Sequence, residues 1–259
     1  MELALGMYSV YSDFLKNPEE TLKKISAMGI KHIEFYGDPI MSADKMKALL
    51  NKYDLNVISW HVEWKFLQER TIDETIAYHK EIGNQVLMIP ALGGPWEVGH
   101  TVDENTSARW LIYCARMGII QERLDKHNFR LGYHTHDYDF GELLDNGQTS
   151  FDILVEHAPK NLFLEVDTGN CIEAKKNPID YLHKIKEQGA FVHCKPYSLE
   201  MGYNTQLGTK EDLNNWQELV DGAKTYTKYF ILETEAEFLN EDKFDIVEND
   251  IKELRKYLE

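Results

Sequence analysis

Short apolar runs alternate with longer amphipathic stretches along the whole chain. The runs are rich in branched aliphatic and aromatic residues, and a stretch with helical spacing follows each of them. This alternation is typical of a parallel sheet whose strands are connected by helices. We therefore expect strands at residues 3–7, 32–37, 56–61, 85–90, 130–134, 161–166, 191–193 and 229–232.

The stretches between the runs carry the usual signals of helix ends. Pro18 opens the first predicted helix, because proline has no N–H to lose in the first turn, and Gly29 ends it. Ser42 is expected to cap a helix over 43–52. A helix over 71–82 has acidic residues in its first turn, where the helix dipole favours them. Further helices are expected at 105–127, 179–187, 212–223 and from 245 onward.

Eight strand–helix units in 259 residues, without a break in composition, favour a closed barrel. The predicted fold class is α/β, a (β/α)8 TIM barrel that forms a single domain over residues 1–259. The alternative is an open, doubly wound sheet. Such sheets usually carry a glycine-rich phosphate turn after the first strand, and residues 6–10 read GMYSV, which does not match.

The charge balance limits the choice of partners. The formal net charge is −16, and lysine and arginine are not concentrated anywhere. A nucleic-acid-binding protein needs cations that replace the counterions of the phosphates, so we expect no nucleic-acid partner, and anionic membrane surfaces are disfavoured for the same reason. No window approaches the roughly 18 apolar residues of a membrane span.

The amino-terminal residues lack the basic start and the long apolar run of a secretory signal. The three cysteines, Cys114, Cys171 and Cys194, form no CxxC pair. Such a sparse, odd set is typical of reduced thiols. We therefore expect a cytoplasmic protein.

Ionisable residues follow or end most of the predicted strands, where barrel enzymes place their active sites. These residues are Glu34, His61, Glu63, His134, His136, Asp137, Glu165, Asp167, His193, Lys195, Glu233 and Glu235. Burying so many unpaired charges would cost roughly several kcal/mol each. A divalent cation would remove the repulsion, and mixed imidazole and carboxylate ligands suit manganese, cobalt, zinc or magnesium. The pattern therefore predicts a metal site at one rim of the barrel.

Five segments of the chain resemble motifs of the sugar phosphate isomerase/epimerase superfamily, the xylose-isomerase-like barrels. Residues 131–140 read LGYHTHDYDF and resemble the YHNHDFEF signature of one branch of that superfamily. Residues 164–170, LEVDTGN, are similar to its LDTGH motif. Residues 192–195, VHCK, resemble HLKD, and residues 231–235, ILETE, resemble VEQE. Residues 207–209, LGT, echo a common LGxG turn, and the five segments occur in the order of the family.

The resemblance implies a divalent metal held by His134, Asp167, His193 and Glu233. In the epimerases of the family, the strand-five ligand is a glutamate that works with the strand-eight glutamate as an acid/base pair. His134 replaces it here, which leaves room for the elimination and dehydration reactions of the superfamily. Pro196 and Asn170 also depart from the HLKD and LDTGH motifs, so substrate contacts are expected to differ.

The expected chemistry is that of a ketone beside a hydroxyl group. A metal polarises the carbonyl, and a base removes the neighbouring proton to give an enediolate. The candidate bases are Glu233 and His136, and Lys195 is a candidate to hold the enolate oxygen. Four further residues are expected to bind the sugar: Tyr8, Trp60, His61 and Asn170.

Several of these residues have a structural alternative. Asp167 could cap the following turn, and His136 could orient His134 without touching a substrate. The two tryptophans Trp60 and Trp64 could pack under loops. Glu165 and Glu235 are expected to pair with lysines, and His32 and His100 to have structural roles only.

The leading hypothesis is a metal-dependent isomerase or epimerase of a sugar or keto-sugar. The alternative is a lyase or dehydratase of a 3-keto-glycoside or keto-inositol at the same metal site. Endonuclease IV shares the superfamily barrel, but a DNA-repair nuclease needs more histidines and basic loops, which the acidic composition argues against. A binding protein that has lost the chemistry is a further class. The expected partner is a small carbohydrate, and the chain could form a homo-oligomer.

Overall fold

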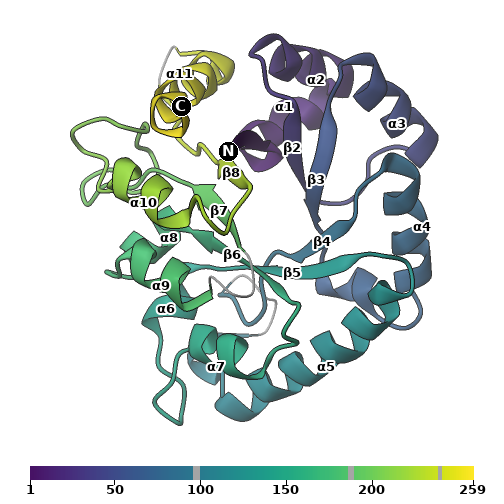
Figure 1. Ribbon diagram of the computed structural model, residues 1–259, viewed down its shortest axis with the longest axis vertical. Coiled ribbons are helices and arrows are strands. Elements are labelled where there is room, and N and C mark those ends of the chain that lie inside the picture. Colours follow the sequence, from purple (N-terminus) through teal and green to yellow (C-terminus); the bar gives the residue numbers. More distant parts are fainter. Residues whose placement is uncertain (96–99, 186–189, 239–240) are drawn as a thin grey trace.

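Eight parallel strands close into a barrel with helices around it, as predicted (Figure 1). A computed structural model describes residues 1–259 except 96–99, 186–189 and 239–240. The strands are hydrogen-bonded in chain order, and β1 pairs with β8 to close the barrel. They are β1 (Glu2–Gly6), β2 (His32–Tyr36), β3 (Asn56–His61), β4 (Val86–Ile89), β5 (Arg130–His134), β6 (Phe163–Asp167), β7 (Ala190–Cys194) and β8 (Tyr229–Leu232).

The helices cover the outer face of the sheet. The α-helices are α1 (Tyr11–Lys16), α2 (Pro18–Ala27), α3 (Ala43–Lys52), α4 (Ile72–Ile82), α5 (Ser107–Asp125), α6 (Asp137–Gly141), α7 (Ser150–His157), α8 (Thr168–Glu173), α9 (Pro178–Ile185), α10 (Trp216–Ala223) and α11 (Lys243–Leu258). The described residues also form the short 3-10 helices η1 (Met7–Val10), η2 (Trp64–Leu67) and η3 (Val102–Glu104). Helix α11 returns to the start of the chain, where Arg255 donates a hydrogen bond to the carbonyl of Met28 (Figure 1).

The predicted helices differ from the observed ones mainly at their ends. Ser42 occupies the N-cap position of α3, but its side chain makes no capping hydrogen bond, so the predicted cap is wrong in that respect. The helix predicted from residue 212 begins at Trp216, because Asp212 accepts hydrogen bonds from the surrounding loop. The last two positions of the helix predicted at 179–187 lie outside the described residues. The short helices α1, α6, α7 and α8 were not predicted.

Buried apolar residues in the described part of the chain form two separate clusters. The larger one lies between the strands and the outer helices. The smaller one consists of alternate strand residues, among them Ala4, Ile58, Phe163 and Phe191, and fills the interior of the barrel. Because this smaller cluster fills only the interior of the barrel, polar side chains can occupy the carboxyl ends of the strands.

The pairing of β2 with β3 contains an irregularity that decides which side chains of β3 face the barrel interior. Ile33 pairs with Val57 but Glu34 pairs with Ser59, so Ile58 is an extra residue on β3. Such a bulge reverses the alternation of faces beyond it. Ile58 belongs to the interior cluster, and His61 rather than Trp60 then points toward the barrel axis.

Two further features concern the apolar character of the helices and the pairing of the cysteines. Within the described ranges, no helix is long and apolar enough to cross a membrane. Cys114, Cys171 and Cys194 are buried and unpaired.

Candidate active site

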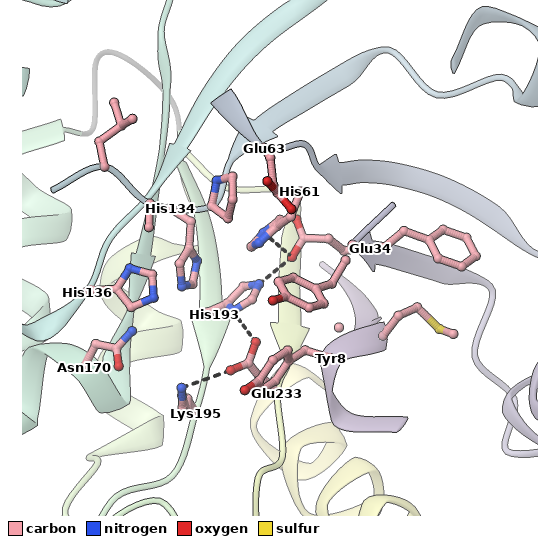
Figure 2. A pocket seen from close by; sticks show the side chains of 18 of the residues that line it. Tyr8, Glu34, His61, Glu63, His134, His136, Asn170, His193, Lys195 and Glu233 are labelled. Carbon is pink, nitrogen blue, oxygen red and sulfur yellow. Dashed lines mark hydrogen bonds and ion pairs between the residues drawn. The ribbon is translucent and has the colours of Figure 1, made fainter. Parts of the chain in front are cut away.

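A pocket of about 1150 Å³ opens at the carboxyl ends of the strands. Its lining includes most of the ionisable residues singled out in the sequence, and Figure 2 shows ten of the lining side chains with labels. The strand ends bring together residues that are far apart in the chain, as the barrel topology predicts. Their contacts fall into two levels along the barrel axis.

The deeper level, here called the lower tier, consists of Glu34, His61 and Glu165. All three are less than a tenth exposed. His61 Nε2 lies 3.1 Å from Glu34 Oε1 and 3.1 Å from Glu165 Oε2, so one imidazole connects the two carboxylates. The Ser59 hydroxyl donates to the Glu34 carboxylate from the neighbouring strand.

The level nearer the pocket mouth, here called the upper tier, consists of Asp167, Lys195 and Glu233. Lys195 Nζ lies 3.0 Å from Glu233 Oε1 and 3.8 Å from Asp167 Oδ2. It also pairs with Glu235, and its ammonium group lies 4.2 Å from the ring centroid of Tyr203. Asp167 Oδ1 accepts a hydrogen bond from the Asn170 N–H, so Asp167 does cap α8, while Oδ2 remains on the side of Lys195.

Two imidazoles, those of His134 and His193, connect the tiers. His193 Nε2 lies 2.5 Å from Glu34 Oε1, whereas its Nδ1 lies 3.3 Å from Glu233 Oε2 and 3.8 Å from Asp167 Oδ2. Figure 2 shows the resulting line of contacts from His61 through Glu34, His193 and Glu233 to Lys195. His134 Nδ1 lies 2.8 Å from Glu165 Oε2, and its Nε2 lies 3.9 Å from Asp167 Oδ2.

The buried charges shift the proton affinities of the lower tier. Burial opposes charge on His61, but Glu34 and Glu165 prevail and raise the pKa of His61 to about 9. Burial raises the pKa of Glu165 to about 7, and the charge of Glu34 adds to this effect. Burial also acts on Glu34, yet the imidazoles of His61 and His193 lower its pKa below the ordinary value. Protons on imidazoles thus offset part of the negative charge.

Burial and neighbouring charges also shift the pKa values of groups around the upper tier. Burial raises the pKa of Glu233, but Lys195 and His193 outweigh it, and the pKa falls below its ordinary value. Burial lowers the pKa of His134 well below its ordinary value, and nearby His193 adds to this shift. His134 is therefore a neutral imidazole at pH 7.

Most of the residues predicted to form the site do line one pocket. Tyr8, His61, His136, Asn170, Lys195 and Glu233 belong to its lining, together with His134 and His193. Asn170 is held at both ends of its amide: Nδ2 donates to the Thr135 carbonyl, and Oδ1 accepts from the Tyr203 hydroxyl. His136 lies with its ring centroid 4.9 Å from that of His134.

Trp60 differs from the prediction. It is 1% exposed and stacks on Phe35 with ring centroids 4.2 Å apart, and its Nε1 donates to the Gly37 carbonyl. The bulge in β3 turns His61 toward the barrel interior, so the preceding residue faces the outer helices. Trp60 is therefore a core residue, while Trp64 lines the pocket.

Two glutamates and two histidines were expected to have structural partners only. Glu235 pairs with Lys195, as expected. Glu165 contacts imidazoles, so its expected pairing with a lysine is wrong. His32 contacts Glu2 at the amino-terminal end of β2, remote from the pocket, and His100 contacts Glu104.

Two residues of the site received no role in the sequence analysis. Glu34 was noted only as a strand-end residue, and no local pattern pairs it with a histidine of β7. Tyr203 lies in the loop after β7, and its contacts with Asn170 and Lys195 depend on how that loop folds back. The position of Glu34 at the end of a strand was the available signal for it.

The upper tier fits a divalent cation. Asp167 Oδ2 and His193 Nδ1 are buried and make no hydrogen bond. Both face Glu233, and one ligand atom from each of the three residues lies within 4.8 Å of the others. A carboxylate oxygen and an imidazole nitrogen left without partners in a buried site are the donor types that manganese, cobalt or zinc accepts.

Comparison with known proteins identifies the fold. No protein-family model and no curated protein sequence matches the chain. A sugar phosphate isomerase/epimerase from Parabacteroides distasonis is similar in structure over 97% of this chain and 96% of its own, with 16% identity and a TM-score of 0.80. An L-ribulose 3-epimerase is similar over 100% and 93%, with 16% identity and a TM-score of 0.72.

A third similar structure is the probable 3-DHS dehydratase AsbF from Bacillus anthracis, with 16% identity over 98% of this chain and 99% of its own and a TM-score of 0.68. The protein is thus an α/β barrel with an imidazole–carboxylate cluster at its mouth. Its fold is that of the sugar phosphate isomerase/epimerase and xylose isomerase-like TIM barrels, as the sequence motifs indicated.

Proposed function

We propose that this protein is a divalent-metal-dependent isomerase or epimerase of a sugar or keto-sugar. The proposal rests chiefly on one observation: the buried atoms Asp167 Oδ2 and His193 Nδ1 have no hydrogen-bond partner and lie 3.8 Å apart in the upper tier. Structurally similar barrels include sugar epimerases, which supports the same substrate class.

His134, Asp167, His193 and Glu233 are the proposed ligands of the cation. When bound, such a cation supplies Lewis-acid polarisation of a substrate carbonyl. Lys195 is then proposed to hold a substrate oxygen that gains negative charge, because its ammonium group lies at the same pocket surface. The candidates for the base that removes the proton next to the carbonyl are Glu233 and His136, which both line the pocket.

A lyase or dehydratase is the second candidate function. The observation that favours it is the position of His134, whose Nδ1 lies 2.8 Å from Glu165 Oε2. An imidazole so held cannot replace the glutamate that forms the acid/base pair of the epimerases. Loss of a β-oxygen substituent requires one base and a stabilised enolate, and a dehydratase is among the similar structures.

The test incubates manganese-loaded protein in deuterated water with ketohexoses, 3-keto-glycosides and keto-inositols. An isomerase or epimerase incorporates deuterium at carbon without a change of elemental composition apart from the label. A lyase gives an unsaturated or dehydrated product. Mass spectrometry and proton NMR distinguish the two outcomes.

Asp167→Asn is the inactive variant expected in this test, and Asp152→Asn is its matched control. Asp152 completes the capping box of Thr149 at the start of α7, outside the pocket, and also accepts from Lys184. The same chemical change there should leave turnover within about twofold of the wild type. Equal turnover by wild type and Asp167→Asn would refute the proposed metal site, and no turnover of any of these substrates would refute the substrate class.

A further inference from the structure

We propose that Glu34 and Glu165 are positioning residues that fix the imidazoles of His193 and His134, so that one defined nitrogen of each ring faces the cation site. The shortest contact of each carboxylate is with one ring, from below: Glu34 lies against His193 Nε2 and Glu165 against His134 Nδ1. Glu165 Oε2 lies farther from His193 Nε2, at 3.4 Å. This inference rests on the metal site proposed above. It adds which atom of each histidine binds and what determines that choice.

The two nitrogens of each ring face different tiers. His193 turns Nε2 toward the lower tier, 2.5 Å from Glu34 Oε1, and Nδ1 toward Glu233 and Asp167. His134 is oriented the other way round, with Nδ1 2.8 Å from Glu165 Oε2 and Nε2 toward Asp167. The two rings therefore use opposite nitrogens for the same purpose.

Above the pKa of Glu165, which is about 7, both carboxylates are ionised and only accept hydrogen bonds, so the ring nitrogen beside each of them carries the proton. Burial opposes charge on His193, but Glu165 and Glu34 outweigh it and raise its pKa well above the ordinary value. A cation that binds this ring displaces one of its two protons, and the neutral imidazole then has a single N–H and a lone pair on the other nitrogen. The lone pairs are thereby assigned to His193 Nδ1 and His134 Nε2. These are the atoms on the side of Asp167 Oδ2, which itself has no hydrogen-bond partner.

The two glutamates are themselves fixed. Glu34 is 2% exposed and Glu165 is fully buried. The hydroxyl of Ser59 donates to Glu34, and His61 Nε2 lies 3.1 Å from both carboxylates. A carboxylate that is fixed in this way holds its imidazole in one orientation. The ring then loses less conformational entropy when a metal binds, so the metal affinity is higher.

The lower tier has a competing interpretation as a second cation site. Ligand atoms of His61, His134, Glu165 and His193 do lie within 4.8 Å of one another. However, a neutral imidazole has one lone pair, so His134 and His193 cannot serve both tiers. The separations of 2.5 and 2.8 Å beneath the two rings are also hydrogen-bond lengths, shorter than the edge of about 3.3 Å between zinc ligands in a tetrahedron.

The experiment measures manganese affinity by isothermal titration for the wild type, Glu34→Gln and Glu165→Gln. Glutamine keeps the size of the side chain, but its amide also donates, so it permits the other tautomer of the ring. Glu235→Gln is the matched control, because Glu235 contacts Lys195 and no ligand imidazole. We expect affinity to fall about 10- to 100-fold for the two positioning variants and less than about threefold for the control.

A second measurement needs no variant. Nitrogen-15 NMR of zinc-loaded wild-type protein with labelled histidine reports which ring nitrogen carries the proton. We expect the proton on Nε2 of His193 and on Nδ1 of His134. Circular dichroism of each variant verifies that the barrel is folded before its affinity is compared.

The outcomes separate the two proposals. If the wild type binds no divalent cation, the proposed function fails. If it binds one cation but Glu34→Gln and Glu165→Gln match Glu235→Gln, or the protons lie on the opposite nitrogens, the positioning roles alone are overturned. Two manganese ions per chain, one of them lost in Glu165→Gln, would identify the lower tier as ligands and would equally overturn them.

Discussion

His193 Nε2 lies 2.5 Å from Glu34 Oε1, although the two residues are 159 positions apart in the chain. Closure of the barrel through the pairing of β1 with β8 leaves only these two strands between β2 and β7, so their side chains meet inside the barrel. The contact is therefore a property of the closed sheet and of no local motif. Through this contact, a side chain of the amino-terminal half of the chain holds one of the carboxyl-terminal half.

Cation binding is expected to stabilise the fold, because the ligand atoms are already assembled. At a manganese concentration 100 times the dissociation constant, the gain is about 2.7 kcal/mol, which corresponds to a melting temperature roughly 5–10 °C higher. Asp167→Asn should abolish this increase. Differential scanning fluorimetry with and without manganese measures it, and an equal increase in the variant would contradict the assignment of Asp167.

Gly169 is expected to tolerate no side chain. A Cβ atom there would lie 2.9 Å from the Lys195 carbonyl oxygen and 2.9 Å from Lys195 Cγ, so alanine must displace the end of β7. We expect Gly169→Ala to lose about 1–3 kcal/mol of unfolding free energy and at least tenfold in turnover. Gly141→Ala is the control, because its Cβ would meet the Ala174 Cβ at 3.4 Å. Urea unfolding of both variants tests this prediction, and equal stabilities would contradict it.

Asp139 is expected to make stability depend on pH. Burial raises its pKa to about 7 from the ordinary 3.8, although Ser150 and the His136 N–H donate to it. A carboxyl whose pKa is raised by folding contributes stability below pH 4 and loses this contribution as pH rises through 7. The loss is at most about 1.4 kcal/mol per pH unit.

Asp139→Asn removes this titration. Its unfolding free energy relative to the wild type should therefore increase between pH 5.5 and 7.5, whatever its value at the lower pH. Urea titrations at three pH values measure the difference in unfolding free energy between Asp139→Asn and the wild type. The contributions of the other titrating groups are common to both proteins and cancel in this difference. A difference that stays constant over this range would show that Asp139 is ionised throughout.

The two tryptophans near the end of β3 are expected to separate stability from binding. Trp60→Phe removes the hydrogen bond to the Gly37 carbonyl and part of a buried stack, so we expect a loss of about 1–3 kcal/mol with manganese affinity within about twofold. Trp64→Phe, in the pocket lining, should cost less than about 1 kcal/mol. If Trp64→Phe were less stable in urea than Trp60→Phe, the assignment of Trp60 to the core would be contradicted.

The strand pattern of the sequence was sufficient to predict the barrel, since β3, β5 and β8 have the predicted bounds. His193 and Lys195 are two positions apart, so strand alternation places them on one face, and both line the pocket. The sugar-binding role expected for Trp60 was wrong, because an extra residue at Ile58 turns His61 toward the barrel interior and Trp60 away from it, and no sequence signal marked that bulge. Glu34 and Tyr203 were missed since their contacts depend on closure of the sheet and on loop folding.

Cys194 lies between two site residues on β7, yet its thiol faces away from the pocket and is fully buried, as is that of Cys171. Burial raises the pKa of Cys114 to about 11, so its reactive thiolate is scarce at neutral pH. Alkylating reagents should therefore modify these thiols only when the barrel opens. Pulsed alkylation followed by mass spectrometry then provides an intrinsic probe of unfolding under native conditions, without any introduced label.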